Sequence, residues 1–246
     1  MNEPLIIAHR GAWHSANVRD NTLEAFHEAL RLGVDMIECD VRRTRDGTVV
    51  LHHDPTIDCQ LLAQLSYREL NRVASSLGFQ VPALTDLVAM TNGKTCLDVE
   101  IKEEGYESEL VGLLEKHLQP EQFVITSFND STVRAIKRNH PHVRAGLILG
   151  KAVPKNVFLT RFVELFPGGR CRRTGADFLV PHYRLLKFGF LERARKHNRA
   201  VFVWTVNDEP LIRSLLRDKR LAAIITDRPD LAVRLRQQLT LRDDSR

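Results

Sequence analysis

The chain has 246 residues, of which 43% are hydrophobic, and its formal net charge is +5. This length can bury a sizeable core. The apolar runs stay short of the roughly 20 residues that a membrane-spanning helix needs, so we expect no stable membrane association. The apolar stretch before His9 is only Leu-Ile-Ile-Ala and follows an acidic Glu3, which does not fit a secretory signal.

Basic residues gather late in the chain, at 168–175, 193–199 and 216–220. Nucleic-acid binding would use such charge. These runs lack interleaved aromatic residues, however, and fit solvated surfaces, so we expect no nucleic-acid partner. We interpret 168–175 as a surface loop before the sixth strand, away from any site. A mildly positive field is compatible with a small anionic substrate.

The cysteines are scattered and form no C-x-x-C pair; they are Cys39, Cys59, Cys96 and Cys171. Reduced thiols in this arrangement are typical of a cytoplasmic protein. We therefore expect a cytoplasmic location. The sequence makes no prediction of the oligomeric state.

Short runs rich in apolar and β-branched residues alternate with amphipathic stretches along the chain. Strands are expected at 5–11, 36–44, 95–102, 123–129, 144–150, 176–182, 200–207 and 222–227. Helices are expected between them at 21–33, 106–118, 130–140, 185–197 and 208–218. The first helix has a candidate N-cap at Asn21 or Thr22 and a terminating Gly33.

Eight strands, each followed by a helix, in about 250 residues predict a (β/α)8 TIM barrel. The alternative is an open doubly wound sheet, which usually carries a glycine-rich phosphate loop after its first strand. Residues 9–21 do not match G-x-G-x-x-G. No low-complexity linker interrupts the pattern, so we expect residues 1–246 to form a single domain.

A further β-rich run at 48–53 follows Asp46-Gly47, which predicts a two-residue hairpin turn. In that register Asp40 opposes His53, so His53 shares a face with Asp40 and His52 faces away. A bulge would reverse this assignment. The hairpin extends the second strand and is followed by a short insertion with two helices, near 66–73 and 84–91. A separate apolar helix is expected much later in the chain, at 156–166.

Polar and aromatic residues recur at the predicted C-terminal strand ends, where TIM barrels carry their active sites. They include His9, Arg10, Glu38, Asp40, Glu100, Lys102, Phe128-Asn129, His182, Trp204 and Asp227. Asp98 shares the face of Glu100 but lies one layer deeper, so we expect it to be a hydrogen-bonded interior residue. Asp227 is expected to cap the final helix, because Asp-Arg-Pro-Asp is typical of a helix start.

Glu38, Asp40 and Glu100 would repel one another if they were left bare. Three carboxylates suit a hard divalent cation with oxygen ligands, Mg²⁺ or Ca²⁺, whereas zinc favours cysteine and histidine. The alternative is a salt-bridged network in which Arg10 and Lys102 neutralise the acids. Cys39 lies between two of the candidate ligands but points to the opposite face.

Two histidines can divide the roles of general acid and base near neutral pH. A cation, Arg10 and Lys102 together supply fixed positive charge. Such charge favours an anion whose charge shifts in the transition state, and a phosphodiester is the natural candidate. Gly11 then lets the chain turn away sharply from the first strand.

The chain resembles the glycerophosphodiester phosphodiesterases over about residues 5–230. The segments that carry this likeness are "IIAHRGAWHSANVRDNTLEAF", "IECDVRRTRDGTVVLHHDPTID", "VEIK", "VPHYRLL", "VWTVN" and "ITDRPD". The resemblance implies a divalent-cation-dependent TIM barrel that converts glycerophosphocholine or glycerophosphoethanolamine to sn-glycerol 3-phosphate and an alcohol. The compact length is similar to that of the small cytoplasmic bacterial members.

The resemblance implies His9 and His53 as the acid–base pair and Arg10 and Lys102 as phosphate ligands. It implies Glu38, Asp40 and Glu100 as metal ligands. The chain departs from the family pattern at Asp20, where the family often has Glu, and at Cys59, where it often has Arg. Both departures fall in loops near the site and affect the expected choice of substrate.

Three further residues are candidate substrate contacts. Trp204 could stack on a choline-like cation or fill the barrel mouth; Phe128 is expected mainly to pack; His182 could reach the substrate or be structural. Two other functions stay open: a lysophospholipid or phosphoinositide headgroup phosphodiesterase, and a non-catalytic barrel that binds glycerophosphodiesters. Retention of both His9 and His53 argues against the latter.

Overall fold

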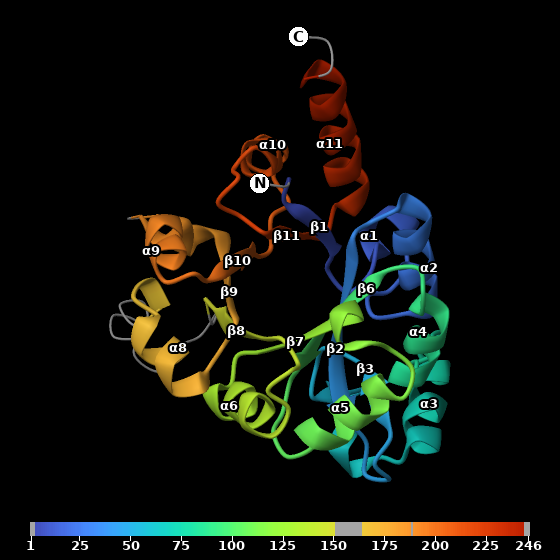
Figure 1. Ribbon diagram of the computed structural model, residues 1–246. Coiled ribbons are helices and arrows are strands. Elements are labelled where there is room, and N and C mark those ends of the chain that lie inside the picture. The colour runs from blue at the N-terminus through green and yellow to red at the C-terminus, as the bar shows by residue number, and fades with distance from the viewer. Residues whose placement is uncertain (1–2, 151–163, 188, 244–246) are drawn as a thin grey trace.

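Parallel strands close into a barrel in the computed structural model, which describes residues 3–150, 164–187 and 189–243 (Figure 1). The barrel strands are β1 (Leu5–Ala8), β2 (Met36–Arg43), β6 (Cys96–Ile101), β7 (Phe123–Ser127), β8 (Ala145–Leu149), β9 (Phe178–Pro181), β10 (Ala200–Val203) and β11 (Ala223–Thr226). Pairing of β1 with both β11 and β2 closes the circle. The predicted (β/α)8 TIM barrel is confirmed.

Helices surround the barrel strands (Figure 1). They are α1 (Trp13–Ala16), α2 (Leu23–Leu32), α4 (Leu84–Thr91), α5 (Glu107–Glu115), α6 (Asp130–Asn139), α8 (Gly168–Thr174), α9 (Phe190–Lys196), α10 (Glu209–Leu216) and α11 (Pro229–Asp243). The expected helix at 156–166 falls mostly on residues 151–163, outside the described residues. Helix α2 shows the predicted limits, because the Thr22 side chain accepts a hydrogen bond from the Ala25 amide and Gly33 ends the helix at φ +69°.

The segment 168–175 is a short helix rather than the predicted surface loop. Pro167 precedes its first turn, and Gly175 ends it with a left-handed φ of +75°. Cys171 and Thr174 point inward and are buried. Sequence reasoning did not detect that one side of this helix is buried, because arginines dominate the segment.

The β2 hairpin turns over three residues, so the predicted register is wrong by one. Strand β3 (Val49–Leu51) pairs Val41 with Leu51 and Arg43 with Val49. Gly47 adopts φ +85° and donates to the Thr44 carbonyl oxygen at 3.1 Å. This geometry is a type I turn followed by a left-handed residue. His52, not His53, therefore opposes Asp40, and its amide donates to the Asp40 carbonyl oxygen at 3.0 Å.

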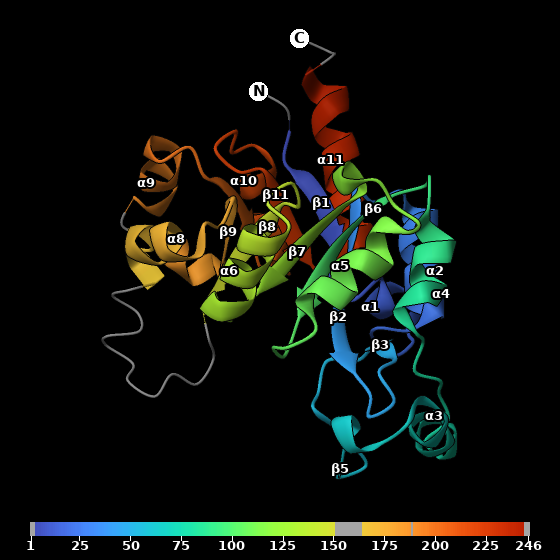
Figure 2. The same cartoon turned by 60° about the horizontal axis from the view of Figure 1, so that its bottom comes forward.

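The insertion after β3 packs around a small core of its own. It contains β4 (Thr56–Ile57), β5 (Gln60–Leu61), a 3₁₀ turn (Leu62–Gln64) and α3 (Tyr67–Ser76). In this core, Val50 of β3 packs with side chains of the insertion: Ile57, Leu62, Leu70, Ala74 and Val81. Figure 2 shows the insertion projecting from one end of the barrel, beyond β2 and β3. It thereby forms one wall beside the strand ends.

The barrel interior is filled by alternate side chains of the strands. Phe178 and Val180 belong to the inner cluster, whereas Leu179 between them belongs to the outer cluster that packs under the helices. Cys39 also belongs to the outer cluster, which confirms that it points away from the face of Glu38 and Asp40.

Gly146→Ala is expected to destabilise the barrel by about 1–3 kcal/mol or more through overpacking. A Cβ atom at Gly146 would lie 2.3 Å from the Phe178 ring, which is fully buried and has Phe202 at a ring-centroid distance of 4.5 Å. Gly112→Ala in α5 is the matched control, because no atom lies within 4 Å of its Cβ position, and we expect it to stabilise the helix by up to about 1 kcal/mol. Equal denaturant midpoints for the two variants would contradict this packing.

Candidate active site

A cavity of about 420 Å³ opens at the C-terminal ends of the barrel strands. Its polar lining includes His9, Arg10, Glu38, His53, Glu100 and Lys102, and its apolar lining includes Phe128, Trp204, Ile148, Val180 and Ile225. The structure therefore brings most of the predicted site residues to one place. Asp40 is fully buried behind this lining.

The carboxylates meet because β2 and β6 are parallel and in register. Glu38 pairs with Asp98, and Asp40 pairs with Glu100. Glu38, Asp40 and Glu100 each offer an oxygen, and these oxygens lie within 4.8 Å of one another. All three side chains are buried, and Glu38 Oε1 has no hydrogen-bond partner among the described residues. Such an orphaned buried oxygen fits a cation site with oxygen ligands.

The electrostatics of this cluster also favour a bound cation. Burial, together with the charges of Asp40 and Glu100, raises the pKa of Glu38 well above its usual value. Burial likewise raises the pKa of Glu100, although Lys102 opposes the shift. Burial would raise the pKa of Asp40 too, but Lys102 and then Arg10 overcome it and hold that pKa below its ordinary range. The cluster thus contains more negative charge than its neighbours neutralise well.

Lys102 and Arg10 make the ion pairs that the alternative interpretation, a salt-bridged network, expected of them. Lys102 Nζ lies 2.6 Å from Glu100 Oε1 and 2.7 Å from Asp40 Oδ1. Arg10 Nε lies 3.1 Å from Asp40 Oδ2, and the Arg10 amide donates to Glu38 Oε2 at 2.8 Å. Asp20, at the position that departs from the family pattern, accepts from the Arg10 guanidinium at 3.0 Å. Both cations therefore lie at the carboxylates and at the cavity wall.

Asn21 is a site residue that sequence reasoning treated only as a candidate cap. It is buried with a left-handed φ of +55°. Its amide nitrogen donates to Asp40 Oδ2 at 2.8 Å, and its amide oxygen accepts from the Asp40 backbone amide at 3.1 Å. These two bonds fix the Asp40 carboxylate. Asparagine tolerates this backbone region better than most residues, but nothing in the spacing indicated its partner.

His9 is held by a carboxylate that the sequence assigned elsewhere. His9 Nδ1 lies 2.6 Å from Asp227 Oδ1, and Asn207 Nδ2 donates to Asp227 Oδ2 at 2.6 Å. The prediction that Asp227 caps the final helix is wrong, because the first helical bond runs from the Ala232 amide to the Arg228 carbonyl oxygen. His9 Nε2 points toward the acidic cluster and lies 4.0 Å from Glu38 Oε2.

His53 reaches the cavity from the segment that follows β3. Its Nδ1 lies 2.7 Å from Asp54 Oδ1. Burial, together with the nearby Lys102 charge, lowers the pKa of His53, which favours the neutral imidazole at neutral pH. His52 faces a smaller neighbouring cavity of about 70 Å³, which His53 and Arg10 also line. The strand has ended at Leu51, so strand alternation no longer decides where either side chain points.

Comparison with known proteins decides the family. The model of the glycerophosphoryl diester phosphodiesterase family matches residues 9–231. The chain belongs to this family. A glycerophosphodiester phosphodiesterase of Caldanaerobacter subterraneus subsp. tengcongensis is 29% identical, over 94% of this chain and 97% of its own length. A probable glycerophosphodiester phosphodiesterase of Mycobacterium tuberculosis is 28% identical, over 92% of this chain and 88% of its own.

Solved structures share the fold. A glycerophosphodiester phosphodiesterase of Thermotoga maritima has a TM-score of 0.77 and 23% identity, over 96% of this chain and all of its own. A phosphodiesterase of Oleispira antarctica, solved with the product sn-glycerol-3-phosphate, has a TM-score of 0.78 and 23% identity, over 95% of this chain and 96% of its own. As a member of the glycerophosphoryl diester phosphodiesterase family, the chain is a phosphoric diester hydrolase.

The apolar wall of the enzyme's cavity is fixed by hydrogen bonds and ring contacts. Trp204 Nε1 donates to the carbonyl oxygens of Leu149 at 3.0 Å and Val180 at 2.9 Å. Phe128 meets the Trp204 ring edge-on at a centroid distance of 5.5 Å. The third predicted substrate contact, His182, packs against Trp204 with the ring centroids 5.3 Å apart. His182 is not among the described residues that line the cavity.

Asp98 is a hydrogen-bonded interior residue, as predicted. It is fully buried and accepts from Thr126 Oγ1 at 2.8 Å. Burial raises its pKa to about 7, although the Thr126 bond opposes the shift.

In the part of the chain that the structure describes, no helix has the length and apolar composition needed to cross a bilayer.

Proposed function

We propose that the enzyme hydrolyses glycerophosphocholine, glycerophosphoethanolamine or related glycerophosphodiesters to sn-glycerol 3-phosphate and an alcohol. The observation that carries this proposal is one cavity lined by two histidines, two cations and a buried carboxylate cluster. The product bound in the Oleispira antarctica phosphodiesterase supports the glycerol phosphate half of the assignment. The cavity volume is in the range of small-molecule sites.

We assign the divalent cation to Glu38, Asp40 and Glu100. When bound, a Mg²⁺ or Ca²⁺ ion would neutralise phosphate oxygens and stabilise the charge that develops on them. Arg10 and Lys102 already border the cavity, and they are placed to bind the remaining phosphate oxygens as the carboxylates take up the cation. Asn21 keeps the Asp40 carboxylate in position through its two hydrogen bonds.

His9 and His53 serve as the general acid and base in this proposal. They enter the cavity from different strand ends, so they can reach opposite sides of a phosphodiester between them. The lowered pKa of His53 suits an imidazole that accepts a proton. Asp227 orients His9 so that Nε2 faces the substrate, and Asn207 orients Asp227.

Asp227→Asn is expected to lower kcat about 10–100-fold with little change in KM, the usual effect of losing an orienting partner. The amide of asparagine cannot hold the imidazole of His9 through the same charge-assisted contact, so Nε2 is less well oriented toward the substrate. Asp230→Asn is the control, since that carboxylate contacts Arg228 instead. An unchanged kcat in Asp227→Asn would show that Asp227 does not position His9.

Substrate preference separates this proposal from its alternatives. The cavity holds about 420 Å³, so we expect faster turnover of glycerophosphocholine than of the larger lysophosphatidylcholine with the same headgroup. The faster substrate would be identified by product release at equal concentrations. Preference for the lysophospholipid would favour a lipid headgroup phosphodiesterase, and tight binding of both without hydrolysis would favour a binding protein.

We also propose a cytoplasmic enzyme, acting as a single domain over residues 1–246 on a free small molecule. The described cysteines support the reducing compartment, since Cys39, Cys59, Cys96 and Cys171 are all free thiols. The proposal includes no nucleic-acid partner and no stable membrane association.

A further inference from the structure

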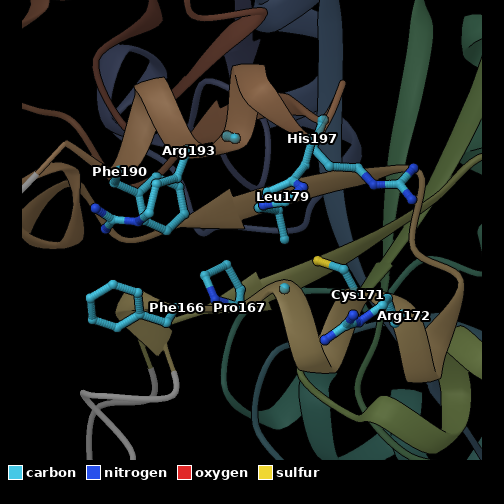
Figure 3. Close-up of a pocket in the computed structure, with 11 residues that line it drawn as sticks. Phe166, Pro167, Cys171, Arg172, Leu179, Phe190, Arg193 and His197 are labelled. Carbon is cyan, nitrogen blue, oxygen red and sulfur yellow. The ribbon is translucent and has the colours of Figure 1, made fainter.

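A second cavity, of about 360 Å³, lies between α8 and α9 on the outside of the barrel. Figure 3 shows its two walls, with Phe166, Pro167, Cys171 and Arg172 on one side and Phe190, Leu179, Arg193 and His197 on the other. Leu179 faces outward from β9, whereas its neighbour Val180 faces the active-site cavity. The two cavities therefore lie on opposite faces of the same strand.

The walls near the barrel are apolar. Leu179, Phe190, Ala194 and Cys171 are buried and line the cavity. Burial raises the pKa of the Cys171 thiol, so this group also stays uncharged at neutral pH. Phe166 at the edge is unusual among the large apolar side chains because it remains 49% exposed. A cavity of this size and character suits an apolar chain.

Among the described residues, the charged side chains that line this cavity are all arginines. They are Arg172, Arg193 and Arg199, and the His197 imidazole lies beside them. Arg193 lies over the Phe166 ring at 4.6 Å and donates to the Leu165 carbonyl oxygen at 2.9 Å. By contrast, no ion pair connects Arg172, His197 or Arg199 to a described acid.

The acids near these helices are engaged elsewhere. Asp130 pairs with Arg170 at 2.6 Å, on the side of α8 toward α6. Glu192 of α9 pairs with Arg195 and Arg220. Glu164 accepts from the Gly150 amide. Among the described residues, Arg172 and Arg199 are therefore left without an acidic partner, and their positive charge is complementary to an anionic head group.

We propose that the cavity between α8 and α9 binds the carboxylate of a single-chain fatty acid, with the chain on the apolar wall and the head group at Arg172 and Arg199. The region 168–175, predicted as surface without a site, thus contributes a ligand pocket. The choice of a carboxylate rests on the proposed function: glycerophosphodiesters arise from phospholipids by hydrolysis of acyl esters, and that reaction class releases fatty-acid anions.

Isothermal titration of the full chain with decanoate, below its micelle concentration, tests this site without measuring hydrolysis. We expect saturable binding of decanoate and at least tenfold weaker binding of decyltrimethylammonium, because only the anion complements the arginines. The double variant Arg172→Gln/Arg199→Gln should bind decanoate at least tenfold more weakly. Arg173→Gln, on the same helix but directed to Asp130 and outside the cavity lining, should bind it like the wild type.

Three results would overturn the proposal: equal affinity for both amphiphiles, unchanged decanoate affinity in the double variant, or binding of decyl phosphate without binding of decanoate. The last result would assign the pocket to a phosphate head group instead. Because the readout is binding alone, a negative result here leaves the hydrolytic assignment standing, and absence of hydrolysis leaves this pocket standing.

Discussion

Replacing either His9 or His53 with alanine is expected to lower turnover roughly 10²–10⁴-fold, the usual contribution of a general acid or base. Both imidazoles line the same cavity, and each has a carboxylate at its Nδ1 atom, Asp227 for His9 and Asp54 for His53. That arrangement leaves Nε2 of each ring for proton transfer. Steady-state kinetics on glycerophosphocholine would measure the effect.

His52→Ala is the matched control for His53. The two histidines are adjacent, but among the described cavities His52 lines only the small neighbouring one, and its Nδ1 contacts the Asp54 carbonyl oxygen. We expect His52→Ala to change turnover little. All three variants should keep the wild-type melting temperature to within a few degrees, since none of the three side chains fills the core. Wild-type turnover in His9→Ala or His53→Ala would remove that residue from the chemistry.

Glu38→Gln is expected to have two opposite effects, on activity and on the stability of the metal-free protein. Activity should fall by more than about 10²-fold, because one of three cation ligands loses its charge. The metal-free protein should become more stable, because Gln removes a buried, raised-pKa carboxyl that stands against Asp40 and Glu100. Melting curves in EDTA and in Mg²⁺ or Ca²⁺ would separate the two effects.

Asp98→Asn distinguishes a cation ligand from a merely buried acid. Asp98 is as deeply buried as Glu38 but lies outside the cluster of three possible ligands. Its replacement should also stabilise the metal-free protein at neutral pH or above, yet it should leave the cation-induced rise in melting temperature intact. Glu38→Gln should abolish that rise. If both variants keep the rise, the cation does not bind at Glu38.

The barrel and the position of the site could be predicted because both depend on repeating local patterns. Apolar runs in strand–helix alternation specify the layers, and polar residues at strand ends then gather at one rim. Residue parity along β2 and β6 was enough to place Glu38, Asp40 and Glu100 together, because regular strands keep their alternation.

The errors occur where the chain leaves regular structure. The hairpin register was wrong because Asp46-Gly47 also fits a three-residue turn, in which Asp46 accepts from the Thr44 hydroxyl and the Tyr67 amide. The partner of His9 was missed because Asp227 lies 218 residues away in sequence, directly after β11, the strand that closes the barrel beside β1. Such contacts depend on tertiary closure, which spacing alone does not reveal.

The most direct test of the central claim is release of sn-glycerol 3-phosphate from glycerophosphocholine and glycerophosphoethanolamine, after EDTA treatment and separate restoration of Mg²⁺ or Ca²⁺. We predict no release by the stripped enzyme and restored release with at least one cation, in the wild type but not in Glu38→Gln. Full activity in EDTA would contradict the metal assignment. No release of sn-glycerol 3-phosphate from either substrate, with either cation, would contradict the proposed reaction.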